Sequence, residues 1–176
     1  MHKLLVITIS LLGLAVAGIA AVVPALAGDG SLPPDLQEVR AAVANYHSFE
    51  QAKRDGYTVA NEPCVASPDG AMGIHAINPA LLANDAIDIQ RPEILLYVPK
   101  SNGKLELAGV EYWKVDADQN LGTNADLPWL FGRAFDGPMP GHGPPGAMPI
   151  HYDMHVWVAE SNPDGPFALF NPAVSC

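Results

Sequence analysis

Residues 93–115 have the sequence EILLYVPKSNGKLELAGVEYWKV, and this stretch decides the fold. Two runs rich in aliphatic and aromatic residues, 93–98 and 104–115, flank a short loop that ends in Asn-Gly at 102–103. An Asn-Gly pair suits the tight turn of a β-hairpin, because both residues tolerate a positive φ. Gly109 within the second run is typical of a β-bulge. The stretch therefore predicts two antiparallel strands joined by a tight turn.

Outside this hairpin, one helix and several further strands are expected. Apolar residues recur at spacings of four and three within residues 35–55, which predicts a single amphipathic helix. Short strands are predicted at 57–59, 72–77 and 150–158, and residues 167–170 could pair once more. A helix followed by mostly antiparallel strands predicts an α+β domain, with the N-terminal helix packed on a curved sheet or partial barrel.

A long irregular region is expected between the hairpin and the last strand, from Asp116 to Pro149. Its final part, Asp136–Pro149, contains five prolines and four glycines, which predicts the absence of regular structure. Loops of this length within a domain are often functional lids, and the alternative is a plain surface connection.

The first 27 residues have the features of a secretory signal peptide. Lys3 precedes a long apolar run, and Ala25-Leu26-Ala27 forms a small-residue cleavage pattern. Cleavage would leave residues 28–176 as a single exported domain, in the periplasm or secreted. The alternative is a retained membrane anchor, because the apolar run is long enough to span a bilayer.

Charge and cysteine content agree with export. The formal net charge is −10, and removing Lys3 with the leader makes it −10 − 1 = −11. Such acidity repels phosphate backbones, so nucleic acid is excluded as a partner. The two cysteines, Cys64 and Cys176, predict a disulfide in an oxidising compartment. A thiolate metal ligand or nucleophile is the alternative, and it requires a reduced thiol.

The predicted strand 150–158 carries a face rich in metal-binding side chains. Apolar residues alternate along it, so His151, Asp153 and His155 share the opposite face. Two histidines four residues apart on a strand stand roughly 13 Å apart, too far to bind one ion. The helical zinc-protease motif is excluded, because Tyr152 occupies the position that requires Glu.

Additional ligands must therefore come from other strands. His75 lies in the predicted strand 72–77 and Glu111 in the hairpin, and a curved sheet could bring both near His155. Two histidines and a carboxylate with open positions suit zinc or non-haem iron. The candidate ligands are His75, Glu111, His151, Asp153, His155 and, from the Pro/Gly-rich loop, His142. The alternative is that Glu111 pairs with a neighbouring Lys or Tyr and that His75 is a core histidine.

Copper is a second metal hypothesis, ranked below zinc and iron. Thioether and imidazole ligands suit reduced copper, and they are concentrated between residues 139 and 155. Met154, however, lies on the apolar face of the predicted strand, which indicates a core position. This candidate set is Met139, Met148 and Met154 with His142, His151 and His155.

Two metal-free functions remain open. The first is a ligand-binding or interaction domain in which Trp113, Trp129 and Trp157 line a binding surface and the histidines are structural. The second is a hydrolase or lyase in which Asp153 and His155 act as a general acid/base pair. The sequence does not establish whether the protein is an enzyme.

Segments spread over most of the predicted exported chain resemble an uncharacterised family of exported bacterial proteins. They are YHSFEQAKRDGYT, PCV, MGIHAINPALL, RPEILLYV, LAGVEYW, LFGRAF, HYDMHVWV and FNPAVSC. The resemblance implies a single exported domain. It carries over no activity, ligand or site residue, because no activity is established for that family.

Overall fold

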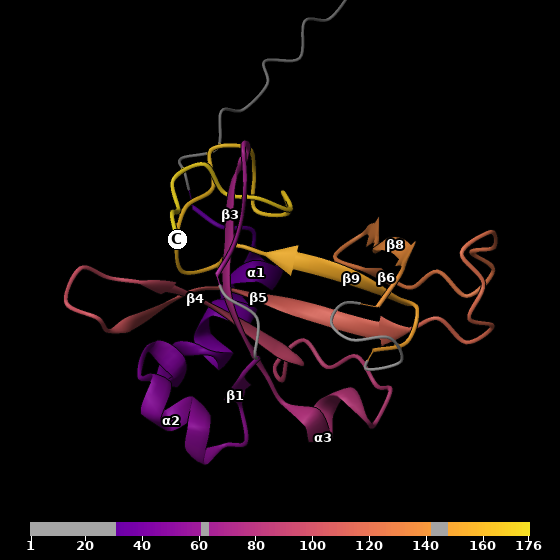
Figure 1. Ribbon diagram of the computed structural model, residues 1–176, viewed down its shortest axis with the longest axis horizontal. Helices are drawn as coiled ribbons and strands as arrows, with labels where there is room; N and C mark the ends of the chain where they lie inside the picture. Colours follow the sequence, from indigo (N-terminus) through magenta and orange to yellow (C-terminus); the bar gives the residue numbers. More distant parts are fainter. Residues whose placement is uncertain (1–30, 61–63, 142–147) are drawn as a thin grey trace, which may run out of the picture. The chain divides into compact units, whose positions relative to one another are not determined.

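The hairpin predicted from residues 93–115 is present as β4 (Ile94–Pro99) and β5 (Leu105–Val115) in Figure 1. The computed structural model describes residues 31–60, 64–141 and 148–176. The two strands pair antiparallel from Ile94 opposite Glu111 to Pro99 opposite Leu105. Their register shifts next to Gly109, which confirms the predicted bulge. Residues 107–113 are all buried, so both faces of β5 are covered.

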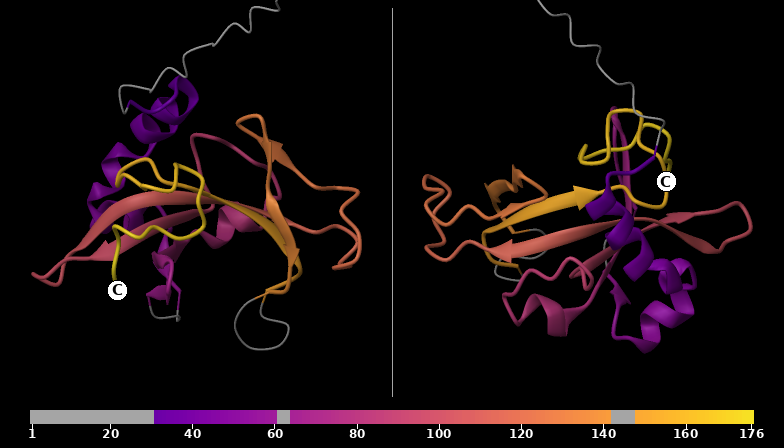
Figure 2. Two further views of the ribbon diagram at one scale, coloured as in Figure 1. Left: turned by 90° about the horizontal axis from the view of Figure 1, so that it is seen from above. Right: turned by 180° about the vertical axis from the view of Figure 1, so that it is seen from behind.

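Seven strands form one antiparallel sheet around this hairpin. Their order is β1-β3-β4-β5-β9-β8, and β2 pairs with β3 as well. This order leaves the sheet open among the described residues, without closure into a barrel. Figure 2 shows that β5 and β9 bend along their length. The other strands are β1 (Thr58–Val59), β2 (Val65–Ser67), β3 (Gly70–Ile77), β8 (Asp136–Met139), β9 (His151–Val156) and the separate pair β6 (Trp129–Leu130) and β7 (Arg133–Ala134).

The prediction of one continuous helix over residues 35–55 is wrong. The segment divides into α1 (Pro34–Ala42), the 3-10 helix η1 (Ala44–His47) and α2 (Phe49–Arg54). Val43 ends α1, and extended Ser48 separates η1 from α2. The breaks occur where Val, Asn, Tyr, His and Ser cluster, all of which have weaker helix propensity than Ala or Leu. A fourth short helix, α3 (Pro79–Leu82), follows β3 and is capped by Asn78.

The helical segments pack on one face of the sheet. The main apolar core joins Leu36, Val39 and Val43 to alternate residues of the central strands, such as Tyr112 of β5 and Met154 of β9. Two buried hydroxyl contacts reinforce this layer. The Tyr97 hydroxyl donates to the Tyr46 carbonyl at 2.6 Å, and the Tyr57 hydroxyl donates to the Pro92 carbonyl at 2.7 Å.

The opposite face of the sheet carries two smaller apolar clusters. One contains Ile94, Leu96 and Trp113, and the other is centred on Trp157 and includes Val174 from the C-terminal segment. The odd-numbered residues of β9 therefore face away from the helices, as the sequence predicts. This face presents the histidines.

The expectation that Asp136–Pro149 lacks regular structure is only partly correct. Its first four residues form β8, which pairs with β9 and places Met139 opposite His151. Pro138 is tolerated because β8 lies at the sheet edge, where a missing N–H leaves no central ladder position unpaired. The possible strand at residues 167–170 is absent, and a single bridge joins Asn171 to Ala71 instead.

The predicted disulfide between Cys64 and Cys176 is present and closes a loop with a sequence separation of 112. By internal contacts, the chain divides into residues 1–31 and residues 32–176. The predicted signal peptide, its cleavage after Ala27 and the domain start at residue 28 lie outside the described residues. None of the helices in the described ranges is long and apolar enough to cross a membrane.

Candidate metal centre

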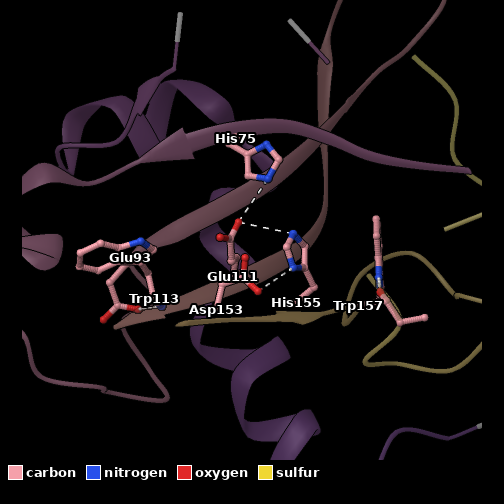
Figure 3. A network of polar contacts seen from close by, with 8 residues as sticks. His75, Glu93, Glu111, Trp113, Asp153, His155 and Trp157 are labelled. Atoms are coloured by element: carbon pink, nitrogen blue, oxygen red, sulfur yellow. Dashed lines mark hydrogen bonds and ion pairs between the residues drawn. The ribbon is translucent and has the colours of Figure 1, made fainter. Parts of the chain in front are cut away.

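Three strands bring His75, Glu111 and His155 together on the face of the sheet opposite the helices. Glu111 of β5 lies directly across from His155 of β9. His75 comes from β3, which is separated from β5 by β4. Figure 3 shows the three side chains pointing toward one another. The alternation of each strand orients them, because their sequence neighbours Ala76, Tyr112 and Val156 belong to the core on the helical side.

Glu111 occupies the centre of this group. Its Oε2 atom lies 3.2 Å from His75 Nε2 and 3.6 Å from His155 Nε2. One potential ligand atom from each residue lies within 4.8 Å of the other two. The two imidazole rings are nearly perpendicular, with centroids 6.0 Å apart. Among the described residues, no fourth His, Cys, Asp or Glu belongs to this group. The group could hold one metal ion.

The group is largely shielded from solvent, with one more accessible member. The side chains of Glu111 and His155 are 6% and 2% exposed, whereas that of His75 is 17% exposed. Glu111 Oε2 lies near the Nε2 atoms of both imidazoles. A buried carboxylate needs a compensating positive charge, and a cation between the three side chains would supply it.

The charges around Glu111 favour its ionised form. Burial by itself would raise the pKa of Glu111, but the imidazoles of His155 and His75 outweigh burial and hold the pKa below its usual range. Asp153 behaves in the opposite way. Burial raises the pKa of Asp153, and the negative charges of Glu111 and Asp136 raise it further. Glu111 is therefore the member of this carboxylate pair that is ready to bind a cation.

Asp153 lies beside the group as a neighbour of His155. Its Oδ1 atom is 3.9 Å from His155 Nδ1, whereas Glu111 approaches the other ring nitrogen, Nε2. Oδ1 is buried and has no hydrogen-bond partner in the described structure. A carboxyl group in this position can fix the tautomer of a metal-binding imidazole. Asp153 and His155 are both buried, which disfavours the alternative of an acid/base pair in an open cleft.

His151, the other predicted ligand on β9, is not part of the group. Its ring stacks on Trp113 with centroids 5.6 Å apart, and its Nδ1 lies 3.0 Å from the Pro149 carbonyl oxygen. The strand geometry that separates His151 from His155 explains this arrangement. His142 lies outside the described residues.

The copper set does not assemble on one face. Met154 packs in the core on the helical side, whereas Met148 packs against the cluster of Ile94, Leu96 and Trp113 on the other side. The core position predicted for Met154 is thereby confirmed.

The proposed tryptophan surface is also wrong. Trp113 and Trp157 are buried, and the indole N–H of Trp157 donates to the Ala168 carbonyl at 2.6 Å. Trp129 is 67% exposed, on the β6–β7 hairpin. Trp113 and Trp157 therefore serve in packing, because the alternation of β5 and β9 directs their side chains toward the small apolar clusters on the histidine face.

Sequence reasoning missed one buried acid near this centre. Glu93 immediately precedes β4, and its Oε2 accepts a hydrogen bond of 3.2 Å from the Trp113 backbone N–H. Nothing in the sequence distinguishes Glu93 from an exposed residue at the end of a strand. No family model, curated protein or solved structure matches the chain. The function is therefore inferred from the site itself.

Proposed function

We propose that the protein is an exported metal-binding protein that holds zinc or iron through His75, Glu111 and His155. The observation that carries the proposal is the convergence of three ligand atoms within 4.8 Å on a buried sheet face. Two imidazoles and one carboxylate are ligands that both metals accept. Soft ligands that would favour copper are absent from this group.

Three protein ligands leave at least one coordination position for water or a substrate. Structural zinc sites normally have four protein ligands, whereas catalytic zinc sites have three and an open position. Non-haem iron enzymes use a comparable set of two histidines and one carboxylate. The partial exposure of His75 provides a side from which an exogenous ligand can approach. An open metal site of this kind would polarise a carbonyl or lower the pKa of bound water.

Export is supported by two independent features. The leader has the pattern of a signal peptide, and the Cys64–Cys176 disulfide suits an oxidising compartment. We accordingly place the protein in the periplasm or outside the cell, as a member of the exported family that its sequence segments resemble.

Asp153 is proposed as a positioning residue for His155. An outer carboxyl group that interacts with a ligating histidine typically improves metal affinity by 10–100-fold. We therefore expect Asp153→Ala to bind metal, but about 10–100-fold more weakly than the wild-type protein.

The experiment is elemental analysis of protein purified from its native compartment, followed by zinc and iron titrations of chelator-treated protein. We expect one equivalent of zinc or iron per chain. His155→Ala and Glu111→Gln should each lose it while retaining the circular dichroism spectrum of the folded protein. The matched control is His47→Ala, which removes an exposed histidine of η1 and should leave the stoichiometry unchanged.

The proposal fails if the wild-type protein contains no zinc or iron and takes up neither during titration. It also fails if a folded His155→Ala variant binds as much metal as the wild type. His151→Ala tests whether His151, the other candidate ligand on β9, also binds the metal. Retention of metal in that variant supports the three-residue group, and loss of metal contradicts it.

A further inference from the structure

The indole N–H of Trp113 is a buried hydrogen-bond donor beside the metal centre. Trp113 is 7% exposed, and its Nε1 atom is buried without a hydrogen-bond partner among residues 31–60, 64–141 and 148–176. A buried donor without an acceptor is costly, so native proteins normally pair such a group with protein, water or a ligand. An indole nitrogen only donates, which means that the group satisfying it must present a lone pair.

Strand geometry places this indole next to the metal-binding residues. Trp113 and Glu111 are two residues apart on β5, so their side chains leave the same face of the sheet about 7 Å apart. Figure 3 shows the nitrogen-bearing edge of the Trp113 ring turned toward the Glu111 carboxylate. His151 stacks on the ring with an interplanar angle of 26° and centroids 5.6 Å apart, which holds it in this orientation. The donor is therefore aimed at the metal centre.

The acids near Trp113 do not accept a hydrogen bond from the indole. Asp153 lies directly across from Trp113 on β9, but its Oδ1 atom is 3.9 Å from His155 Nδ1 and has no hydrogen-bond partner in the described structure. Glu93 accepts from the backbone N–H of Trp113, and not from Nε1. Within the described part of the chain, the indole N–H is thus available to a molecule bound at the metal centre.

The surroundings restrict the size and polarity of such a molecule. Ile94 and Leu96 of β4 lie across from Glu111 and His75, and they form an apolar cluster with Trp113. The most accessible metal-binding side chain, that of His75, is only 17% exposed. A molecule that enters is therefore small. In apolar surroundings of this kind, a hydrogen bond to an ionised acceptor is stronger than it is in water.

We propose that the metal centre binds a small carboxylate, with one oxygen on the metal and the other accepting a hydrogen bond from the Trp113 indole N–H. This inference rests on the proposed metal-binding function and names the class of its exogenous ligand. Trp113 is then the residue that selects for an oxyanion at the open coordination position.

Charge and hydrogen bonding both favour a carboxylate over a neutral ligand. Two neutral imidazoles and the Glu111 carboxylate leave a divalent metal with uncompensated positive charge, which is costly in a buried site. A carboxylate ligand neutralises this charge and retains lone pairs for the indole. Imidazole provides the contrasting case. When one of its nitrogens binds a metal, the other carries a hydrogen and cannot accept from Trp113.

The test compares the binding of acetate and imidazole to Co²⁺-loaded full-length protein, followed by the visible absorption of the metal. The wild type should bind both. Trp113→Phe keeps an aromatic ring against His151 but removes the donor. This variant should bind acetate at least about tenfold more weakly, the effect of losing roughly 1.4 kcal/mol, and should bind Co²⁺ and imidazole normally. Trp129→Phe is the matched control, because Trp129 is 67% exposed, and it should bind both ligands like the wild type.

The indole N–H resonance of Trp113 gives a second readout that does not require Trp113→Phe to fold. In ¹⁵N-labelled, zinc-loaded wild-type protein, this proton should move downfield as acetate is added. The Trp157 indole already donates to the Ala168 carbonyl, so its resonance should stay in place. Spectra of Trp129→Phe and Trp157→Phe assign the resonances by elimination, since the chain has three tryptophans.

Three results would overturn the role given to Trp113 and leave the metal centre intact. They are metal-loaded wild-type protein that binds no acetate, a Trp113→Phe variant that changes acetate and imidazole affinity equally, and a Trp113 indole resonance that acetate does not move. An equal loss for both ligands would mean that Trp113 only supports the shape of the site. Absence of metal uptake by the wild type would instead overturn the proposed function, and the carboxylate site with it.

Discussion

Glu93 is a buried acid whose ionisation couples folding to pH. It is 2% exposed, and burial raises its pKa to about 7. The hydrogen bonds from its own N–H and from the Trp113 N–H oppose this shift, while the charges of Glu111 and Asp88 add to it. Because the unfolded value is near 4.5, the folded chain binds more protons than the unfolded chain between pH 4.5 and 7. The contribution of Glu93 to stability is therefore full below pH 4.5 and is lost as pH rises through 7.

Glu93→Gln should remove this dependence. The amide stays neutral, and its carbonyl oxygen can still accept from the Trp113 N–H. Between pH 5 and pH 8, the wild-type protein should lose about 2–3 kcal/mol of stability relative to the variant, by proton linkage over a shift of this size. Urea denaturation of both chelator-treated proteins at the two pH values measures the difference. Parallel pH profiles would show that Glu93 remains ionised in the folded state.

At the residue scale, alternation along the strands predicts much of the metal centre. His155 is assigned to the correct face, and the strand spacing correctly keeps His151 out of a shared site. The role of Asp153 is not predictable in the same way. Its position on the same strand face as His155 suits both a direct metal ligand and a residue that only contacts the ligand His155. The burial of Glu93 is also not predictable, because it depends on the tertiary contact between the Glu93 side chain and the Trp113 backbone N–H.

The pairing of β5 with β9 is the element-scale contact on which the metal centre depends. Gly109 lies close to the β9 backbone, and a Cβ atom there would stand 2.7 Å from the Val156 carbonyl oxygen. The Val156 carbonyl group cannot move away from such a Cβ atom without displacing β9. Since Val156 directly follows His155, the position of this ligand depends on the absence of a side chain at residue 109.

Gly109→Ala should therefore lower both stability and metal affinity. We expect a loss of about 1–3 kcal/mol, typical of overpacking, and at least tenfold weaker binding of zinc or iron. Thermal denaturation and metal titration measure the two effects. Gly103→Ala is the matched control, because Gly103 has φ +76° but no atom within 4 Å of its Cβ position. That variant should lose about 1–2 kcal/mol from backbone strain and bind metal normally. Equal metal affinity in both variants would contradict the role given to Gly109.

Sequence patterns predict the long elements better than the short ones. The β4–β5 hairpin and β9 carry strong alternation and turn signals, and each is present within one or two residues of the expected bounds. The helical segment from Pro34 to Arg54 keeps a helical period across its breaks, so periodicity alone does not reveal them. β8 is hidden by its prolines and glycines, because its pairing at the sheet edge is a tertiary effect.

At the scale of the whole molecule, strand order is the feature that the sequence does not determine. β9 is the last strand in the chain, yet it lies between β5 and β8. Any curved antiparallel sheet would satisfy the local patterns, and only long-range packing selects this one. The convergence of His75, Glu111 and His155 is consequently a prediction about topology, although the local pattern identifies each residue. The disulfide is different, because a chain with two cysteines allows only one pairing.

The Cys64–Cys176 disulfide should contribute to stability mainly by restricting the unfolded chain. For a sequence separation of 112, the chain-entropy model gives about 4–5 kcal/mol. The double variant Cys64→Ser/Cys176→Ser should accordingly unfold at a urea concentration about 2 M lower, given a slope of 1–3 kcal/mol per molar for small proteins. An unchanged midpoint would show that the bridge does not restrict the unfolded chain in this way.

The same variant tests whether the C-terminal segment supports the metal centre. Val174 packs with Trp157, two residues beyond His155, and Asn171 exchanges backbone hydrogen bonds with Ala71 of β3. These contacts do not require the disulfide, so the variant should still bind one equivalent of metal when folded. Loss of metal from folded double-serine protein would instead mean that the bridge itself keeps the C-terminal segment packed against β3 and Trp157. In that case reduction of the Cys64–Cys176 disulfide would release metal from the His75–Glu111–His155 site.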